Sequence, residues 1–164
     1  MEITKAKLDG VLVIKPGQSE DFRGSYAELY NAGLYRKNGI EVDFVQDDIC
    51  TSSKGVLRGI HGDDKTWKLV SCLWGRFYLV VVDPKKQWES FVITESNRLQ
   101  VLIPPKFGTG HLALVDKSVL YYKQSTYYDP NGQFTLKWND PKLGIWWPIK
   151  NPILSRRDEE GRYV

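Results

Sequence analysis

Two histidines are the side chains best suited to acid–base chemistry in this 164-residue chain. His61 ends the strand-like segment 55–61, GVLRGIH, and His111 follows the turn-like run 104–110, PPKFGTG. Arg58 and Lys68 place positive charge near His61 in the sequence, which suits recognition of phosphate and stabilisation of an enolate. A histidine at a strand end is also often a structural residue, and both cations could belong to the solvated surface.

The spacing of the histidines does not indicate a metal centre. A mononuclear site needs two or three histidines and a carboxylate around one ion. His61 and His111 lie far apart in the sequence and form no HxH or HxxxH pair. We therefore expect a protein that uses neither a metal nor another cofactor.

The elements that must position these residues are mostly short β-strands. Apolar, β-branched runs bounded by turn residues predict strands at 11–14, 56–61, 69–83, 91–94, 99–103, 112–115 and 119–123. One helix is predicted at 27–37, where Leu29, Tyr30, Leu34 and Tyr35 recur at helical intervals before Asn38-Gly39. Strands at this spacing favour a β-sandwich or β-barrel.

Composition predicts one globular domain, 1–164, with an apolar core of its own. The 23 basic and 20 acidic residues are interspersed, so a nucleic-acid partner is not indicated, whereas a small anionic ligand is compatible. The two cysteines form no CxxC pair and the N-terminus has no apolar leader, which favours a reduced, cytoplasmic protein. No apolar run approaches the roughly 20 residues of a membrane-spanning helix.

Several short motifs follow one another along nearly the whole chain. Residues 21–28 read DFRGSYAE, and QDD at 46–48 precedes the GVLRGIH segment. Further pieces are KLV at 68–70, VD at 82–83, IPP at 103–105, YK at 122–123, YY at 127–128, WNDP at 138–141, WP at 147–148 and LSRRD at 154–158. In this order they resemble the dTDP-4-dehydrorhamnose 3,5-epimerase family, with its DxRGxFxE and QDN…GVLRGLH segments.

The resemblance implies an all-β, cupin-like jelly-roll barrel with a few short peripheral helices. It also implies a homodimer in which N-terminal segments help complete the neighbour's site. Carried over by position, His61 resembles the general base, Asp158 its carboxylate partner, Lys68 the donor to the keto oxygen and Tyr122 the proton donor on the opposite face. The positions that bind the sugar nucleotide in the family are Arg23, Glu28, Gln46, Arg58 and Tyr128.

These residue types fit the chemistry of an epimerase. A hydrogen beside a ketone is acidic because the anion delocalises onto oxygen, so the enzyme needs a base and a cation or donor at that oxygen. A carboxylate such as Asp158 would fix the tautomer of the imidazole and favour its charged form. Inversion also requires that the proton return from the other face, and a phenol can deliver it.

The sequence departs from the family pattern in three places. The loop between His61 and Lys68 is shorter than usual, which makes Lys65 a rival for the role of Lys68. Thr109 takes the position of a family histidine, and His111 follows two residues later. His111 either reaches the same pocket or packs in the core, since two residues along a strand restore the same face. Finally, Asp48 and Cys50 replace the usual Asn and Ser, and Pro84-Lys85 replaces the usual arginine after Val82-Asp83.

The stretch 58–68, RGIHGDDKTWK, also resembles a branch of the family that acts on GDP-linked 4-keto-heptoses. We therefore expect a GDP-4-keto-heptose as substrate, inverted at C3 or at C3 and C5, in the biosynthesis of a surface polysaccharide such as a capsule. A dTDP-4-keto-6-deoxyhexose is the second choice. The alternatives are a cupin sugar-nucleotide 3,4-ketoisomerase, which needs no donor on the opposite face, and a sugar-nucleotide-binding protein without activity.

Overall fold

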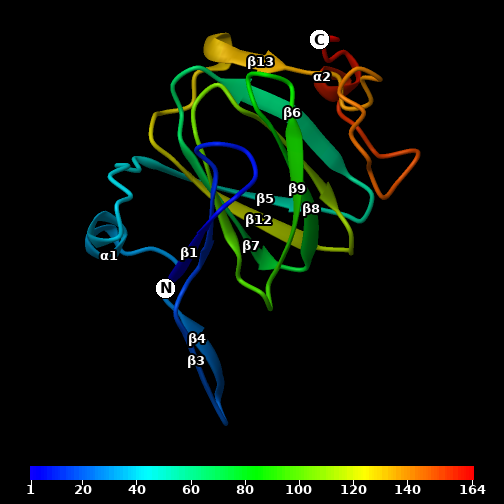
Figure 1. Ribbon diagram of the computed structural model, residues 1–164. Coiled ribbons are helices and arrows are strands. Elements are labelled where there is room, and N and C mark those ends of the chain that lie inside the picture. Colours follow the sequence, from blue (N-terminus) through cyan, green and yellow to red (C-terminus); the bar gives the residue numbers. More distant parts are fainter.

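The computed structural model describes residues 1–164 and consists of two antiparallel β-sheets that face each other (Figure 1). The first sheet has the order β1 (Glu2–Lys5), β2 (Leu12–Lys15), β10 (Gln100–Ile103), β7 (Lys68–Trp74), β12 (Ser118–Gln124) and β5 (Gln46–Ser52). The second has the order β13 (Gln133–Thr135), β6 (Leu57–Asp63), β11 (Gly108–Ala113), β8 (Arg76–Val82) and β9 (Trp88–Thr94). The predicted all-β jelly-roll barrel is confirmed.

From β5 to β8 the chain alternates between the two sheets. The β-rich stretch expected at 69–83 forms two strands, because Gly75 separates β7 from β8. Gly75 has a φ of +77°, and a Cβ at this position would lie 2.6 Å from the Ser118 hydroxyl oxygen. Only glycine adopts this conformation without strain, so the chain turns here from one sheet to the other.

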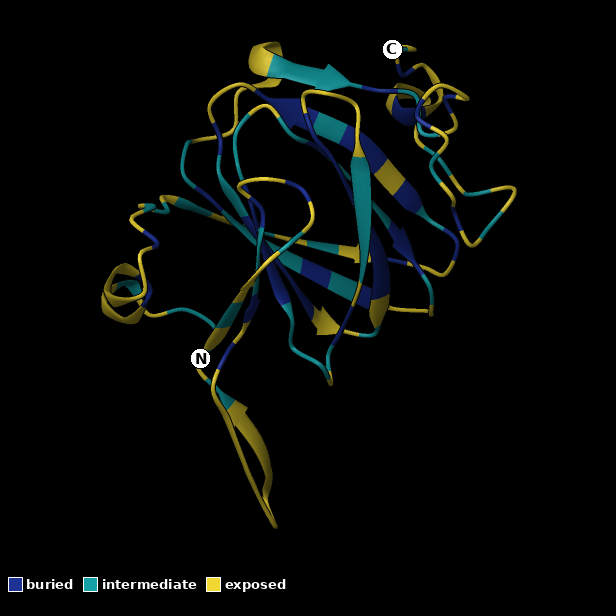
Figure 2. Ribbon diagram, in the orientation of Figure 1, coloured by how far each residue is buried: buried dark blue, intermediate teal, exposed yellow.

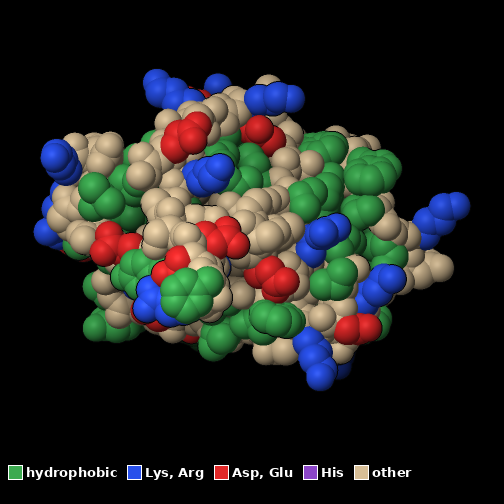
Figure 3. Space-filling model, turned by 90° about the horizontal axis from the view of Figure 1, so that it is seen from below, with side chains coloured by type: hydrophobic (Ala, Val, Ile, Leu, Met, Phe, Trp, Pro, Cys, Tyr) green, Lys and Arg blue, Asp and Glu red, His purple; other side chains and the backbone are tan.

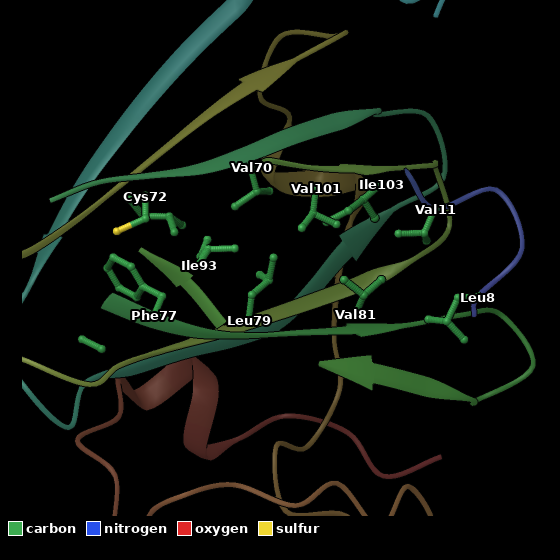
Figure 4. Packing of buried hydrophobic residues seen from close by; sticks show 12 residues of the cluster. Leu8, Val11, Val70, Cys72, Phe77, Leu79, Val81, Ile93, Val101 and Ile103 are labelled. Atoms are coloured by element: carbon green, nitrogen blue, oxygen red, sulfur yellow. The ribbon is translucent and has the colours of Figure 1, made fainter. Parts of the chain in front are cut away.

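The core lies between the sheets and also behind the second sheet. Phe77, Leu79 and Val81 of β8 point into the barrel towards Val70 and Cys72 of β7 (Figure 4). The alternating residues Tyr78, Val80 and Val82 pack outwards under the segment that carries Leu143 and Trp147. Because β8 is buried on both faces, its sequence is a continuous apolar run rather than an alternating one.

The helices are short and peripheral. They are α1 (Ala32–Lys37), the 3₁₀-helix η1 (Pro130–Gly132) and α2 (Arg156–Glu159). The helix predicted at 27–37 begins too early, because Ala27 ends strand β4 and Asn31 caps α1 by accepting a 3.0 Å hydrogen bond from Leu34 N. No helix of the structure is sufficiently long and apolar to cross a membrane.

A two-stranded hairpin, β3 (Gln18–Asp21) and β4 (Gly24–Ala27), projects away from the barrel (Figure 1). Almost all of it is exposed (Figure 2), and Phe22 at its tip is 98% exposed. Viewed from the side of the hairpin, acidic and basic side chains are interspersed on the surface, as the composition predicts (Figure 3).

Candidate active site

A cavity of about 440 Å³ lies between the two sheets. Its lining comes from β5, β7 and β12 of the first sheet, from β6, β8, β11 and β13 of the second, from Tyr128 and from the segment around α2. Every site residue predicted from the sequence lines this cavity, except Arg23 and Glu28. The predicted residues that line the cavity are Gln46, Arg58, His61, Lys68, Thr109, His111, Tyr122, Tyr128 and Asp158.

His61 enters the cavity from β6 and is bonded to a buried carboxylate. Its Nε2 lies 2.6 Å from Oδ1 of Asp158, a side chain that is only 2% exposed. Ser155, the N-cap of α2, donates a 2.7 Å hydrogen bond to the other carboxylate oxygen. Burial raises the pKa of Asp158, but the hydrogen bonds from His61 and Ser155 outweigh it and hold the pKa below its usual value. The ionised carboxylate therefore fixes Nε2 as a donor and leaves Nδ1 to accept a proton.

Tyr122 enters the same cavity from β12, in the opposite sheet. Burial, together with the nearby Asp48 and Cys50, raises the pKa of Tyr122 to about 12. Asp48 is the cross-strand neighbour of Tyr122 in β5, so its carboxylate disfavours a tyrosinate directly. The phenol is consequently protonated at neutral pH. The imidazole and the phenol thus reach one cavity from facing walls.

Lys68 is the first residue of β7, and it is the lysine that the fold brings to the cavity. Burial lowers the pKa of its ammonium group; Arg157 acts in the same direction and Asp63 opposes both. No carboxylate forms an ion pair with Lys68, so its ammonium group is available to a ligand. Lys65, the rival considered from the sequence, is exposed and does not line the cavity.

Thr109 and His111 both line the cavity, and the pairing of β11 with β6 is irregular between them, because β6 has one residue more between the partners His61 and Arg58. The Thr109 hydroxyl donates a 3.2 Å hydrogen bond to the His61 carbonyl oxygen. His111 lies against Phe77, with ring centroids 5.5 Å apart, and its Nε2 is 3.6 Å from Sγ of Cys50. Burial, reinforced by Arg58, lowers the pKa of His111 to about 3. His111 therefore does both things considered from the sequence: it reaches the cavity as a neutral ring and packs against the core.

Several lining residues were not predicted as part of the site. Asp48 accepts hydrogen bonds from the amide groups of Gln46 (2.8 Å) and Gln124 (2.6 Å). Gln124 follows Tyr122 by two residues on one strand, a spacing that could have indicated it. Arg157 could have been found beside Asp158. The remaining lining residues without a predicted role are the polar or thiol side chains Cys50, Gln133 and Ser155 and the apolar side chains Val70, Leu79 and Leu120.

Arg23 and Glu28 lie outside the cavity, on and just after the projecting hairpin. Arg23 is exposed and pairs with Asp21 at 2.6 Å. The fold of one chain thus does not bring either residue to His61. No group of three or more His, Cys, Asp or Glu side chains is arranged to hold a metal ion.

Comparisons with known proteins agree with this geometry. The family model described as dTDP-4-dehydrorhamnose 3,5-epimerase matches residues 5–164. A dTDP-4-dehydrorhamnose 3,5-epimerase from Methanothermobacter thermautotrophicus is 36% identical over 94% of this chain and 89% of its own length.

Two solved structures are similar over 99% of this chain. The dTDP-4-dehydrorhamnose 3,5-epimerase of Bacillus anthracis, with TDP and PPi bound, has a TM-score of 0.95, 29% identity and 99% of its chain covered. The dTDP-6-deoxy-D-glucose-3,5-epimerase of Legionella pneumophila, in complex with dTDP-4-keto-L-rhamnose, has a TM-score of 0.93, 34% identity and 92% of its chain covered. The prediction of an isomerase is confirmed. The chain belongs to the dTDP-4-dehydrorhamnose 3,5-epimerase family.

Proposed function

We propose that this protein inverts C3 and C5 of a dTDP-linked 4-keto-6-deoxyhexose. The observation that carries the proposal is the arrangement of His61, bonded to Asp158, and the protonated phenol of Tyr122 on facing walls of one cavity. The names of the relatives favour dTDP-linked sugars, and none of them supports the GDP-4-keto-heptose expected from the sequence. The order of preference between these two substrates is therefore reversed.

Each inversion proceeds in two proton transfers. Nδ1 of His61 takes the proton from the carbon beside the ketone, and the electron pair of the C–H bond delocalises onto the keto oxygen as an enolate. Lys68 donates a hydrogen bond to that oxygen, where the negative charge develops. Tyr122 then gives its proton to the opposite face of the carbon, and solvent returns a proton to the tyrosinate and takes one from His61. A base positioned in this way contributes typically about 10²–10⁴-fold.

The diphosphate of the nucleotide sugar binds next to the sugar ring, on the part of the cavity that carries Arg58 and Arg157. Arg58 is held by Ser52, whose hydroxyl accepts a 3.2 Å hydrogen bond from the guanidinium group. One guanidinium group can donate two parallel hydrogen bonds to two oxygens of a phosphate, which suits Arg58 and Arg157 to this role. Gln46 and Tyr128 lie together at the cavity, since the Gln46 side chain accepts a 2.9 Å hydrogen bond from Tyr128 N.

A second copy of the chain supplies Arg23 and Glu28. The hairpin is too exposed to be explained by contacts within one chain, and Phe22 and Tyr26 offer apolar surface to a partner. We expect a homodimer in sedimentation experiments. Arg23→Ala should raise KM with little change in kcat, because Arg23 would bind the nucleotide rather than the reacting carbon.

The decisive experiment is incubation of candidate substrates in heavy water, with NMR detection of deuterium at C3 and C5. A dTDP-4-keto-6-deoxyhexose and a GDP-4-keto-heptose are compared at equal concentration. Exchange at both carbons of the dTDP sugar supports the proposal, and exchange at C3 alone identifies a single-centre epimerase. Preference for the GDP-heptose overturns the substrate assignment. A relocated ketone favours the ketoisomerase alternative, and binding without exchange favours a protein without activity.

A further inference from the structure

Asp63 is the last residue of β6, and the chain leads from it to Lys68, the first residue of β7; Asp63 itself does not line the cavity. Only 9% of it is exposed. Its Oδ1 accepts hydrogen bonds from Lys65 N (3.0 Å) and Thr66 N (2.7 Å). The short connection between β6 and β7 is therefore folded around this carboxylate, which fixes the point at which Lys68 enters the cavity.

The other carboxylate oxygen of Asp63 links the β6–β7 connection to Gln133, a residue that lines the cavity. Oδ2 accepts a 3.3 Å hydrogen bond from the Gln133 side chain on β13. The amide oxygen of Gln133 in turn accepts a 3.4 Å hydrogen bond from Arg157. Asp63 is thus connected to the α2 segment, which holds Asp158.

The charge of Asp63 also acts on Lys68. The groups that affect the Lys68 ammonium are Asp63 from β6 and Arg157 from α2, while His111 on β11 is a further titratable neighbour. The other charged or titratable side chains of the cavity are Asp48 on β5, Arg58 and His61 on β6, Tyr122 on β12, Tyr128 and Asp158. Burial and Arg157 disfavour the charged ammonium, whereas Asp63 favours it. No ion pair forms between Asp63 and Lys68, so the carboxylate acts at a distance and leaves the ammonium free to bind.

We propose that Asp63 is a positioning residue that acts on the reaction through Lys68. Its carboxylate folds the β6–β7 connection and so sets where Lys68 enters the cavity, and its negative charge favours the charged form of the ammonium that donates to the substrate carbonyl. The hydrogen bond from Lys68 to the substrate carbonyl rests on the proposed function. The effect on the charge of Lys68 exists without substrate.

Asp63→Asn removes the charge and keeps the two backbone hydrogen bonds at Oδ1, while its amide nitrogen loses the hydrogen bond from Gln133. The titration of lysine Cε signals is followed by NMR in the ¹³C-labelled full chain, and Lys68→Met identifies the Lys68 signal. Lys68 should titrate at lower pH in Asp63→Asn than in the wild type. An unchanged titration in the folded variant overturns the proposal. If Asp63→Asn does not fold, Asp63→Ser retains a hydroxyl acceptor for the turn and is read in the same way.

Asp83 provides a matched control. It is also 9% exposed, follows strand β8, and its Oδ1 accepts a 2.8 Å hydrogen bond from Gln87 N, but it does not line the cavity and is not among the charges that act on Lys68. Asp83→Asn should leave the titration of Lys68 where it is. A shift of equal size in both variants would show a general effect of net charge and would overturn the specific role of Asp63.

Kinetics test the consequence for the reaction. The alkaline limb of the kcat/KM profile should move to lower pH in Asp63→Asn, while the acidic limb and the profile of Asp83→Asn stay unchanged. A uniform loss at every pH would assign Asp63 a purely structural role and overturn the proposal. If the wild type exchanges no proton of any substrate, the proposed function fails, and the NMR titration still decides whether Asp63 controls Lys68.

Discussion

The two facing walls of the cavity carry groups suited to opposite proton transfers: His61 on one wall can accept a proton, and Tyr122 on the other can donate one. On the side of the second sheet, the ionised Asp158 of α2 is hydrogen-bonded to Nε2 of His61, so Nδ1 is left to accept a proton from the substrate. On the first sheet, burial and Asp48 raise the pKa of Tyr122 to about 12, so this wall holds a proton that is already there. Both walls use a carboxylate. The difference is that one carboxylate accepts a hydrogen bond from its partner, whereas the other lies beside the phenol and repels a negative charge on it.

This comparison explains how one cavity can support inversion. A base and an acid with similar surroundings would compete for the same protonation state. Here the surroundings differ before any substrate binds: the histidine is hydrogen-bonded to a carboxylate, whereas the half-buried tyrosine has a carboxylate beside it that disfavours its anion. Lys68 lies in the same sheet as Tyr122, and the charges that act on its ammonium group are those of Asp63 and Arg157.

The largest effect is expected for His61→Ala. Without the base, proton abstraction should slow by on the order of 10³-fold, within the range of general-base catalysis. Exchange of substrate hydrogen with heavy water measures the loss, and circular dichroism checks that the barrel is folded. Asp158→Asn keeps the base and removes the charge of its partner, so its loss should be smaller. An exchange rate in His61→Ala equal to that of the wild type would show that His61 is not the base.

Tyr122→Phe should separate exchange from inversion. His61 can still remove and return the proton on its own face, so deuterium should enter the substrate, while inverted product should form about 10²-fold more slowly. Tyr121→Phe is the control, because its ring lies on the same strand but does not line the cavity. NMR of the product distinguishes retained from inverted carbon. Undiminished inversion in Tyr122→Phe would show that the acid comes from elsewhere.

A smaller effect concerns His111, which shares the wall of His61 but has no carboxylate bonded to its ring. Burial and Arg58 lower its pKa to about 3, below the 6.5 of an unfolded chain. The unfolded chain therefore binds a proton more readily, and stability present above pH 6.5 is lost as the pH falls towards 3. Between pH 7 and pH 5 this amounts to up to about 2 kcal/mol.

His111→Gln removes the titrating ring and keeps a neutral polar side chain beside Cys50. Urea unfolding at pH 7 and pH 5 should then show a smaller decrease in the free energy of unfolding than in the wild type. The difference between the two pH values is the measurement, because any packing cost of glutamine is common to both. Equal decreases in both proteins would mean that His111 is not buried as a neutral ring.

Strands could be predicted from the sequence where their side chains are buried, and were missed where they are exposed. The strands around the core were found because β8 and its neighbours are apolar, β-branched runs. β3 is fully exposed and β5 alternates between intermediate and exposed residues, so neither has an apolar signature. The helix was predicted too long because Leu29 and Tyr30 continue its period into a segment that is not helical.

For the site, the order of the motifs indicated which residues to expect, although it did not show how they are arranged. Lys65 and Lys68 differ by three positions, and only the fold of the short connection decides between them. The position of His111 likewise depended on the irregular pairing of β11 with β6, where Gly59 of β6, with a φ of +125°, allows a bulge whose register only the fold decides.

The sequence by itself determined the chemical types available for proton transfer and the family to which their order belongs. The tertiary structure decided which wall each group occupies, which of two lysines reaches the cavity, and which groups carry a charge. The physical reason is that a pKa depends on burial and on neighbours, and these neighbours come from distant parts of the chain: Asp158 lies beside His61, and Asp48 beside Tyr122.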